Sequence, residues 1–137
     1  MELKTTKAST KAIVKAFGGI ENLAIYEVKM PKPKSLEVVI ALTSIGMNQA
    51  DLMARRGEYR LSSGEPPFVP GIEGGGIITA IGTDVENRQI GQRVILSLSA
   101  PQGQGTYRSH FVAAASDTIP VPENIPNHLI GALWLPI

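Results

Sequence analysis

The sequence predicts a mainly β domain, a closed or partly open barrel that carries short helices. Seven short apolar stretches alternate with polar residues or are rich in β-branched side chains, as in strands. The 14 glycines and 10 prolines lie between these stretches as turn signals. Strands of this length are better protected in a barrel than in an open sheet with bare edges. The expected strands cover residues 11–17, 23–28, 36–45, 76–82, 93–99, 106–114 and 117–121.

The stretch EVVIALTSI, residues 37–45, shows the alternation most clearly. Val38, Ile40 and Leu42 fall on one face of a strand, and Val39 and Ala41 fall on the other. Both faces are apolar, so this strand is predicted to be buried on one side and half-buried on the other.

Composition excludes several classes of function. The 13 Lys and Arg residues nearly balance the 12 Asp and Glu residues, so no broad basic surface indicates nucleic acid or an anionic membrane as partner. The absence of cysteine removes disulfides and thiolates, and two histidines leave few ligands for zinc, so we expect no metal site. No apolar run reaches the length of a membrane span, and residues 1–10 lack the apolar core of a secretory signal. We therefore expect a cytoplasmic protein with a small-molecule ligand.

Two segments depart from the strand pattern. Residues 48–57 are predicted to form a short helix. Asn48 can cap its start, the Asp51 carboxylate lies near the positive end of the helix dipole, and Gly57 can end the helix. Within it, Met53 can face inward. The second helix is expected from Pro126, carrying Leu129, Ile130, Leu133 and Trp134. The resulting division is a mobile arm over 1–10, a domain over 11–125 and the start of a helix over 126–137.

Several conspicuous residues have plain structural explanations. The glycines of PGIEGGGIITAIG have neither the spacing nor the following helix of a dinucleotide fingerprint, so close backbone packing explains them better. Glu73 within that run is either a buried, partnered carboxylate or part of a surface turn. His110 is expected to be a satisfied or surface histidine because no triad spacing surrounds it. Arg55 and Arg56 are either solvated at a helix end or able to bind a phosphate.

Six blocks in order resemble the N-terminal GroES-like catalytic domain of medium-chain dehydrogenase/reductases. They are AFGGIENLAIYEV, SIGMNQADLMARRGEY, PFVPGIEGGGIITAIGTDV, IGQRVILSL, GTYRSHFVAAASDTIPVPENI and GALWLP. Within that superfamily the blocks look most similar to the zinc-independent NADPH:quinone oxidoreductases. The fold that this resemblance implies is a GroES-like, partly open β-barrel.

The resemblance also implies roles for individual residues. Zinc-dependent relatives have a Cys and a His where this chain has Asn48 and Ile72. Without a Lewis acid, reduction of a quinone or an activated double bond is easier than oxidation of an alcohol. The family pattern implies that Asn48 lines the cleft near the nicotinamide and that Tyr59 offers its phenol to the substrate oxygen, with Met53 also in contact with substrate. Asp51 and Glu73 match carboxylates that brace the metal site in zinc relatives.

The chain ends where the family's nucleotide-binding Rossmann domain is expected to begin. We therefore expect NADPH to be the cofactor of the complete enzyme and not to bind this chain appreciably, whether the chain is a fragment or the product of a shortened gene. A homodimer is possible. Two alternatives stay open: a 2-enoyl thioester reductase domain, which GTYRSHFV also resembles, and a GroES-like binding module without catalytic activity.

Overall fold

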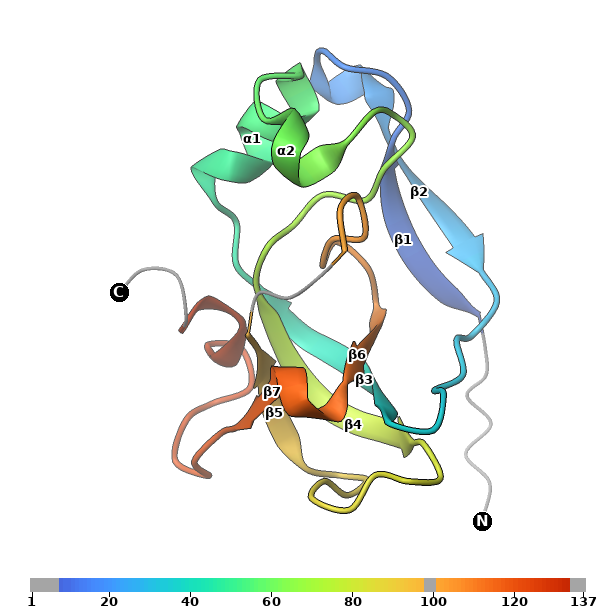
Figure 1. The fold of residues 1–137 in the computed structure, drawn as a ribbon. Helices are drawn as coiled ribbons and strands as arrows, with labels where there is room; N and C mark the ends of the chain where they lie inside the picture. The colour runs from blue at the N-terminus through green and yellow to red at the C-terminus, as the bar shows by residue number, and fades with distance from the viewer. Residues whose placement is uncertain (1–7, 98–100, 134–137) are drawn as a thin grey trace.

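The computed structural model describes residues 8–97 and 101–133 and contains seven strands in two antiparallel sheets (Figure 1). β1 (Ser9–Val14) and β2 (Leu23–Val28) form a hairpin. The second sheet has the order β6-β3-β4-β5-β7, and its strands are β3 (Glu37–Ile45), β4 (Gly74–Ile81), β5 (Arg93–Leu96), β6 (His110–Ala114) and β7 (Thr118–Pro120). This arrangement confirms the predicted mainly β fold, a GroES-like, partly open barrel.

Short helical segments connect the strands. Two α-helices, α1 (Gln49–Arg56) and α2 (Arg60–Ser63), lie together at one end of the molecule, beyond the end of the five-stranded sheet (Figure 1). The described residues also form three 3-10 turns: η1 (Ile20–Asn22), η2 (Ala115–Asp117) and η3 (Ile130–Ala132). No helix in the described part of the chain is long and apolar enough to cross a membrane.

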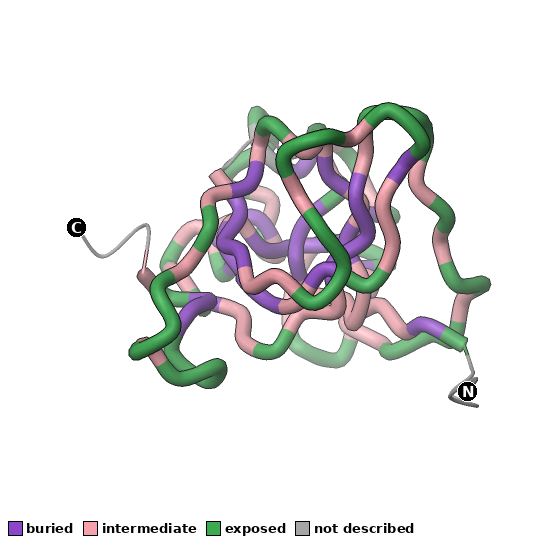
Figure 2. The backbone as a smooth tube through the Cα atoms, turned by 90° about the horizontal axis from the view of Figure 1, so that it is seen from below, coloured by how far each residue is buried: buried purple, intermediate pink, exposed green. Residues whose placement is uncertain are grey.

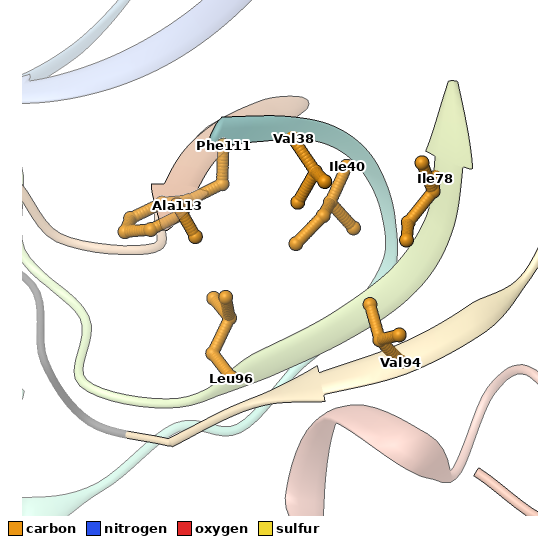
Figure 3. Packing of buried hydrophobic residues seen from close by; sticks show 7 residues of the cluster. All are labelled: Val38, Ile40, Ile78, Val94, Leu96, Phe111 and Ala113. Atoms are coloured by element: carbon orange, nitrogen blue, oxygen red, sulfur yellow. The ribbon is translucent and has the colours of Figure 1, made fainter. Parts of the chain in front are cut away.

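The main core lies inside the curved sheet. Val38 and Ile40 of β3 and Ile78 of β4 have no exposed surface, and they pack with side chains of β5 and β6 (Figure 3). A smaller cluster of Val14, Ala54 and Phe68 joins the hairpin to α1. Figure 2 shows most of the buried segments gathered in the middle of the molecule. Burial of this apolar surface is the main stabilising contribution to such a fold.

The glycines of residues 74–76 pack tightly, as the sequence predicts. They begin β4, and a β-carbon at Gly76 would lie 2.0 Å from the carbonyl oxygen of Ala41 on β3. The pairing of β3 with β4 shifts register between Leu42 and Ser44, which marks an irregularity at this contact.

The predicted boundary of the N-terminal arm is wrong by two residues. Residues 1–7 lie outside the described part of the chain, but Ser9 and Thr10 already belong to β1. Ser9 is buried, and its hydroxyl lies 3.0 Å from that of Ser109, while the Ser109 N–H donates to the Thr10 carbonyl. These long-range hydrogen bonds extend the strand toward the N-terminus, ahead of the residues whose apolar pattern predicts it.

The predicted tail helix is also wrong over residues 126–133, and Trp134 lies outside the described residues. The segment forms isolated turns with bonds between residues three apart, such as Leu129 N–H to the Pro126 carbonyl. The Gly131 N–H donates to the Ser44 hydroxyl at 2.7 Å, and a β-carbon on Gly131 would lie 2.0 Å from the Ser44 carbonyl oxygen. Ile130 is consequently buried against the barrel and is not left uncovered.

Candidate functional site

The turn after β3 places Asn48 at the start of α1. Asn48 has extended backbone, and its N–H donates to the Asp51 carboxylate at 2.9 Å, while the Asp51 N–H donates back to the Asn48 carbonyl at 2.9 Å. Gly57 ends the helix in the left-handed conformation, with φ of 86°. The predicted helix over 48–57 is therefore confirmed.

Two buried carboxylates flank Asn48. Asp51 is 5% exposed and Glu73 is 2% exposed. The Asn48 side-chain amide donates to the Glu73 Oε2 atom at 2.9 Å. Gly46 leaves room for Glu73, since a β-carbon there would lie 2.3 Å from the same oxygen. Asn48 therefore links both carboxylates, Asp51 through its backbone and Glu73 through its side chain. Of the two interpretations that the sequence left open for Glu73, the structure shows the buried, partnered carboxylate.

Tyr107 completes this network, and sequence reasoning missed it. Its phenol donates to the Asp51 Oδ2 atom at 2.8 Å, the same oxygen that accepts the Asn48 N–H. The two residues are 56 positions apart, so no local pattern pairs them. The only available signal was the position of Tyr107 in GTYRSHFV, one of the blocks that carry the resemblance.

Burial controls the electrostatics of the network. Burial raises the pKa of Asp51, the hydrogen bonds from Asn48 and Tyr107 oppose the rise, and the neighbouring charge of Glu73 adds to it. Burial, and then the hydrogen bond to Asp51 and its charge, also raise the pKa of Tyr107 well above the usual range. The Tyr107 phenol therefore stays protonated and remains a donor to Asp51.

A cavity of about 320 Å³ lies between the two α-helices and the loops at 68–72 and 103–105. Asp51 and Tyr59 both line it, and Tyr59 is 39% exposed. Within the described residues, the Tyr59 phenol makes no hydrogen bond. Asn48 and Met53 are not among the lining residues, so the structure joins Asn48 to Asp51 and Glu73 but does not bring Asn48 and Tyr59 to one cavity wall.

The residues at this site do not fit the zinc ion of related enzymes. Asn48 and Ile72 supply neither thiolate nor imidazole, and no group of three His, Cys, Asp or Glu side chains gathers within residues 8–97 and 101–133. Two carboxylates and an amide remain, and Asn48 donates a hydrogen bond to each carboxylate.

The other candidates from the sequence have structural roles. His110 Nδ1 lies 3.1 Å from the Ser9 hydroxyl and 2.9 Å from the Ser109 hydroxyl, which confirms a satisfied histidine, and burial lowers its pKa. The Arg55 guanidinium donates to the Gly18 carbonyl at 3.0 Å and so ties α1 to the hairpin.

Comparison with protein families decides the assignment. The model of the alcohol dehydrogenase GroES-like domain matches residues 34–123. The chain belongs to this family. It is similar to the N-terminal part of medium-chain dehydrogenase/reductases, a group of oxidoreductases.

The relatives are longer proteins. A synaptic vesicle membrane protein VAT-1 homolog of Danio rerio is 36% identical over 124 residues, which are 88% of this chain and 24% of that protein. An alcohol dehydrogenase of Moraxella sp. is 39% identical over 83 residues, 61% of this chain and 24% of the enzyme.

Solved structures agree with the fold. The quinone oxidoreductase of Escherichia coli, complexed with NADPH, superposes with a TM-score of 0.77 at 25% sequence identity. The superposition covers 92% of this chain and 37% of the quinone oxidoreductase chain. The CurK enoyl reductase superposes with a TM-score of 0.80 at 22% identity, over 93% of this chain and 39% of its own, and shows the fold alone. The chain thus spans about a quarter of the length of the first relative and under half of these structures.

Proposed function

We propose that this chain is the substrate-side domain of a zinc-independent, NADPH-dependent oxidoreductase that reduces quinones or similar activated acceptors by hydride transfer. Membership of an oxidoreductase family supports the general class, and the NADPH complex of the similar Escherichia coli quinone oxidoreductase supports the cofactor. The replacement of zinc ligands by Asn48 and Ile72 supports an acceptor that needs no Lewis acid.

One observation carries the proposal: Tyr59, whose phenol has no hydrogen bond to the described residues, lines a cavity whose wall includes buried Asp51. Such a phenol can donate to an acceptor oxygen as negative charge develops there. NADPH supplies the hydride when it is bound. This chain's own part is to position the acceptor against Tyr59 and to hold Asn48 rigidly at the edge of the site through the bonds to Asp51 and Glu73.

The test uses the longest gene product that contains these 137 residues. We expect it to oxidise NADPH with quinones, and we expect Tyr59→Phe to lower kcat by about 10²-fold, the usual effect of removing one oxyanion donor. Tyr26→Phe is the matched control, because Tyr26 on β2 is 41% exposed and does not line the cavity. Equal kcat/KM for Tyr59→Phe and wild type would remove Tyr59 from the mechanism. A folded protein that oxidises no NADPH with any activated acceptor would end the proposal.

A 2-enoyl thioester reductase is the second candidate. Its specific support is the resemblance of the segment GTYRSHFV to that branch; the Tyr107 phenol in this segment is partly buried and donates to Asp51. The same assay with enoyl thioesters in place of quinones separates the two, because kcat/KM will favour the natural class of acceptor.

A non-catalytic binding module is the third candidate. It predicts ligand binding by the 137-residue chain alone and no NADPH oxidation by the longest gene product.

A further inference from the structure

β2 is an edge strand with one open side. In the described part of the chain it pairs with β1 alone, and Figure 1 shows it on the outer side of the hairpin. Two of its large apolar side chains meet solvent, since Ile25 is 70% exposed and Tyr26 is 41% exposed. An open edge of this kind can accept another strand, because its backbone groups are unpaired.

The hydrogen bonds of β1 show which backbone groups of β2 face the open side. Ala12 directs its N–H away from β2 and donates it to the Tyr107 carbonyl at 2.8 Å. Neighbouring residues of a strand direct these groups to opposite sides, so Lys11 faces β2. Lys11 and its register partner Tyr26 are therefore a hydrogen-bonded pair of the hairpin.

Ile25 and Glu27 flank Tyr26, so they direct their N–H and C=O groups away from β1, to the open side. Neither residue forms a backbone hydrogen bond on that side with any described residue. Two consecutive sites for strand pairing are therefore available on β2.

The charges at the end of β2 are self-complementary. Glu27 and Lys29 carry opposite charges two positions apart, the spacing of side chains on one face of an extended chain. Both are exposed, and neither forms an ion pair in the part of the chain that the structure describes. The chain makes no turn or bend between Val28 and Pro31, and a proline favours an extended residue before it. The strand direction can thus continue past Val28.

We propose that β2 pairs antiparallel with β2 of a second copy of this chain, about a two-fold axis at Val28. Glu27 then lies opposite Lys29 of the second copy, and the symmetry repeats this ion pair on the other side of the axis. The outward N–H and C=O of Glu27 exchange hydrogen bonds with the same lysine residue. On the opposite face Tyr26 lies against Met30 of the second copy, which is 38% exposed, so two solvent-exposed apolar side chains cover each other.

The same charges oppose the neighbouring registers. Moving the axis to position 27 sets Glu27 against Glu27 of the second copy, and moving it to position 29 sets Lys29 against Lys29. Placing the axis between two residues sets the outward groups of β2 against groups that already bond to β1. The register centred on Val28 is therefore favoured. None of these residues lines the cavity at Tyr59, so the pairing does not depend on the proposed oxidoreductase function.

Sedimentation of the 137-residue chain over about a hundredfold range of concentration tests the proposal. One strand pair is a small interface, so we expect a weak monomer–dimer equilibrium in which the fraction of dimer rises with concentration. A chain that is monomeric at every concentration overturns the proposal.

Charge reversal locates the interface. Glu27→Lys and Lys29→Glu should each raise the dimer dissociation constant about tenfold or more, because each sets like charges opposite each other on both sides of the axis. The double variant restores opposite charges and should return the dissociation constant to the wild-type value. Glu21→Lys and Lys15→Glu are matched controls, because both residues are exposed and lie at the other end of the hairpin. An equal rise with the controls, or no recovery in the double variant, contradicts the register.

A proline at position 25 tests the backbone pairing without a change of charge. Ile25→Pro removes an N–H that faces the open side and leaves the hydrogen bonds between β1 and β2 in place, so circular dichroism should show a folded chain. Its dimer dissociation constant should rise about tenfold or more. A folded Ile25→Pro chain with the wild-type dissociation constant overturns the proposal, and the charge-reversal series decides if this variant does not fold.

Discussion

The buried carboxylate of Asp51 gives the sharpest test of the site. Both of its recorded hydrogen bonds, from the Asn48 N–H at 2.9 Å and from the Tyr107 phenol at 2.8 Å, end on Oδ2. An asparagine with its carbonyl oxygen at that position accepts both bonds without bringing a charge into the interior. We therefore expect Asp51→Asn to be as stable as wild type or more stable at neutral pH. Asp51→Ala removes the acceptor altogether.

The cost of Asp51→Ala follows from the groups it strands. The Tyr107 phenol and the Asn48 N–H each lose their acceptor, at about 1–2 kcal/mol for each partly buried donor. The expected loss is about 2–4 kcal/mol, which lowers the melting temperature by about 6–20 °C in a domain of this size. Urea unfolding followed by circular dichroism measures both variants under one set of conditions.

The pH dependence provides an independent check with a definite sign. Burial raises the pKa of Asp51 in the folded chain above its ordinary value of 3.8. The folded state therefore holds the proton more tightly than the unfolded state. The contribution of Asp51 to stability is fully present below pH 3.8 and is lost as the pH rises through the folded-state pKa. The stability of Asp51→Asn relative to wild type should thus increase from acidic to neutral pH. This reasoning would be refuted if Asp51→Asn lost as much unfolding free energy as Asp51→Ala. It would also be refuted if the difference in stability between Asp51→Asn and wild type did not change with pH.

Two further predictions test the packing and the titration of other residues. Ile130→Ala should destabilise the chain by about 2–5 kcal/mol in urea unfolding, because the Ile130 side chain is only 1% exposed. Leu129→Ala is the control: Leu129 is 48% exposed, so its loss should be well under half of that for Ile130→Ala. Equal losses for the two variants would mean that η3 does not anchor the segment. Burial lowers the pKa of His110 below its ordinary value of 6.5, so its contribution to stability is present above pH 6.5 and falls as the pH drops through the folded-state pKa. His110→Gln should flatten this acid limb of the stability profile, and parallel profiles for variant and wild type would contradict the assignment.

Sequence patterns predicted the features that depend on nearby residues. The helix from Asn48 to Gly57 was predictable because its cap, its first-turn carboxylate and its terminating glycine all lie within ten residues of chain. The seven strands were predictable for the same reason, since alternation is a local signal. The hydrogen bonds at the site are not local: Asn48 and Glu73 are 25 positions apart, and Asp51 and Tyr107 are 56 apart.

The tail shows how a tertiary contact overrides a local pattern. Its apolar spacing resembles that of a helix, but the Gly131 N–H donates to the Ser44 hydroxyl. The backbones of Gly131 and Ser44 lie too close together for any side chain at position 131. Burial of Ile130 then stabilises the turn conformation in place of a continuous helix. The strand start at Ser9 has the same kind of cause, because its bonds come from residues 100 positions away.

The arrangement around Asn48 is costly for stability, and this supports a functional role. Asp51 and Glu73 are both almost fully buried, and the charge of Glu73 adds to the rise in the pKa of Asp51. A domain whose interior was arranged for stability alone would hold amides or apolar groups there, since buried charges are seldom the most stable choice. Functional sites are where proteins commonly accept such costs, because a rigid, preorganised set of polar groups improves binding and catalysis. If that explanation holds, Asp51→Asn should separate the two properties in the longest gene product: stability retained or raised, and NADPH oxidation reduced. An Asp51→Asn protein with undiminished turnover would assign the carboxylate to folding alone and leave Tyr59 as the remaining functional group of the proposal.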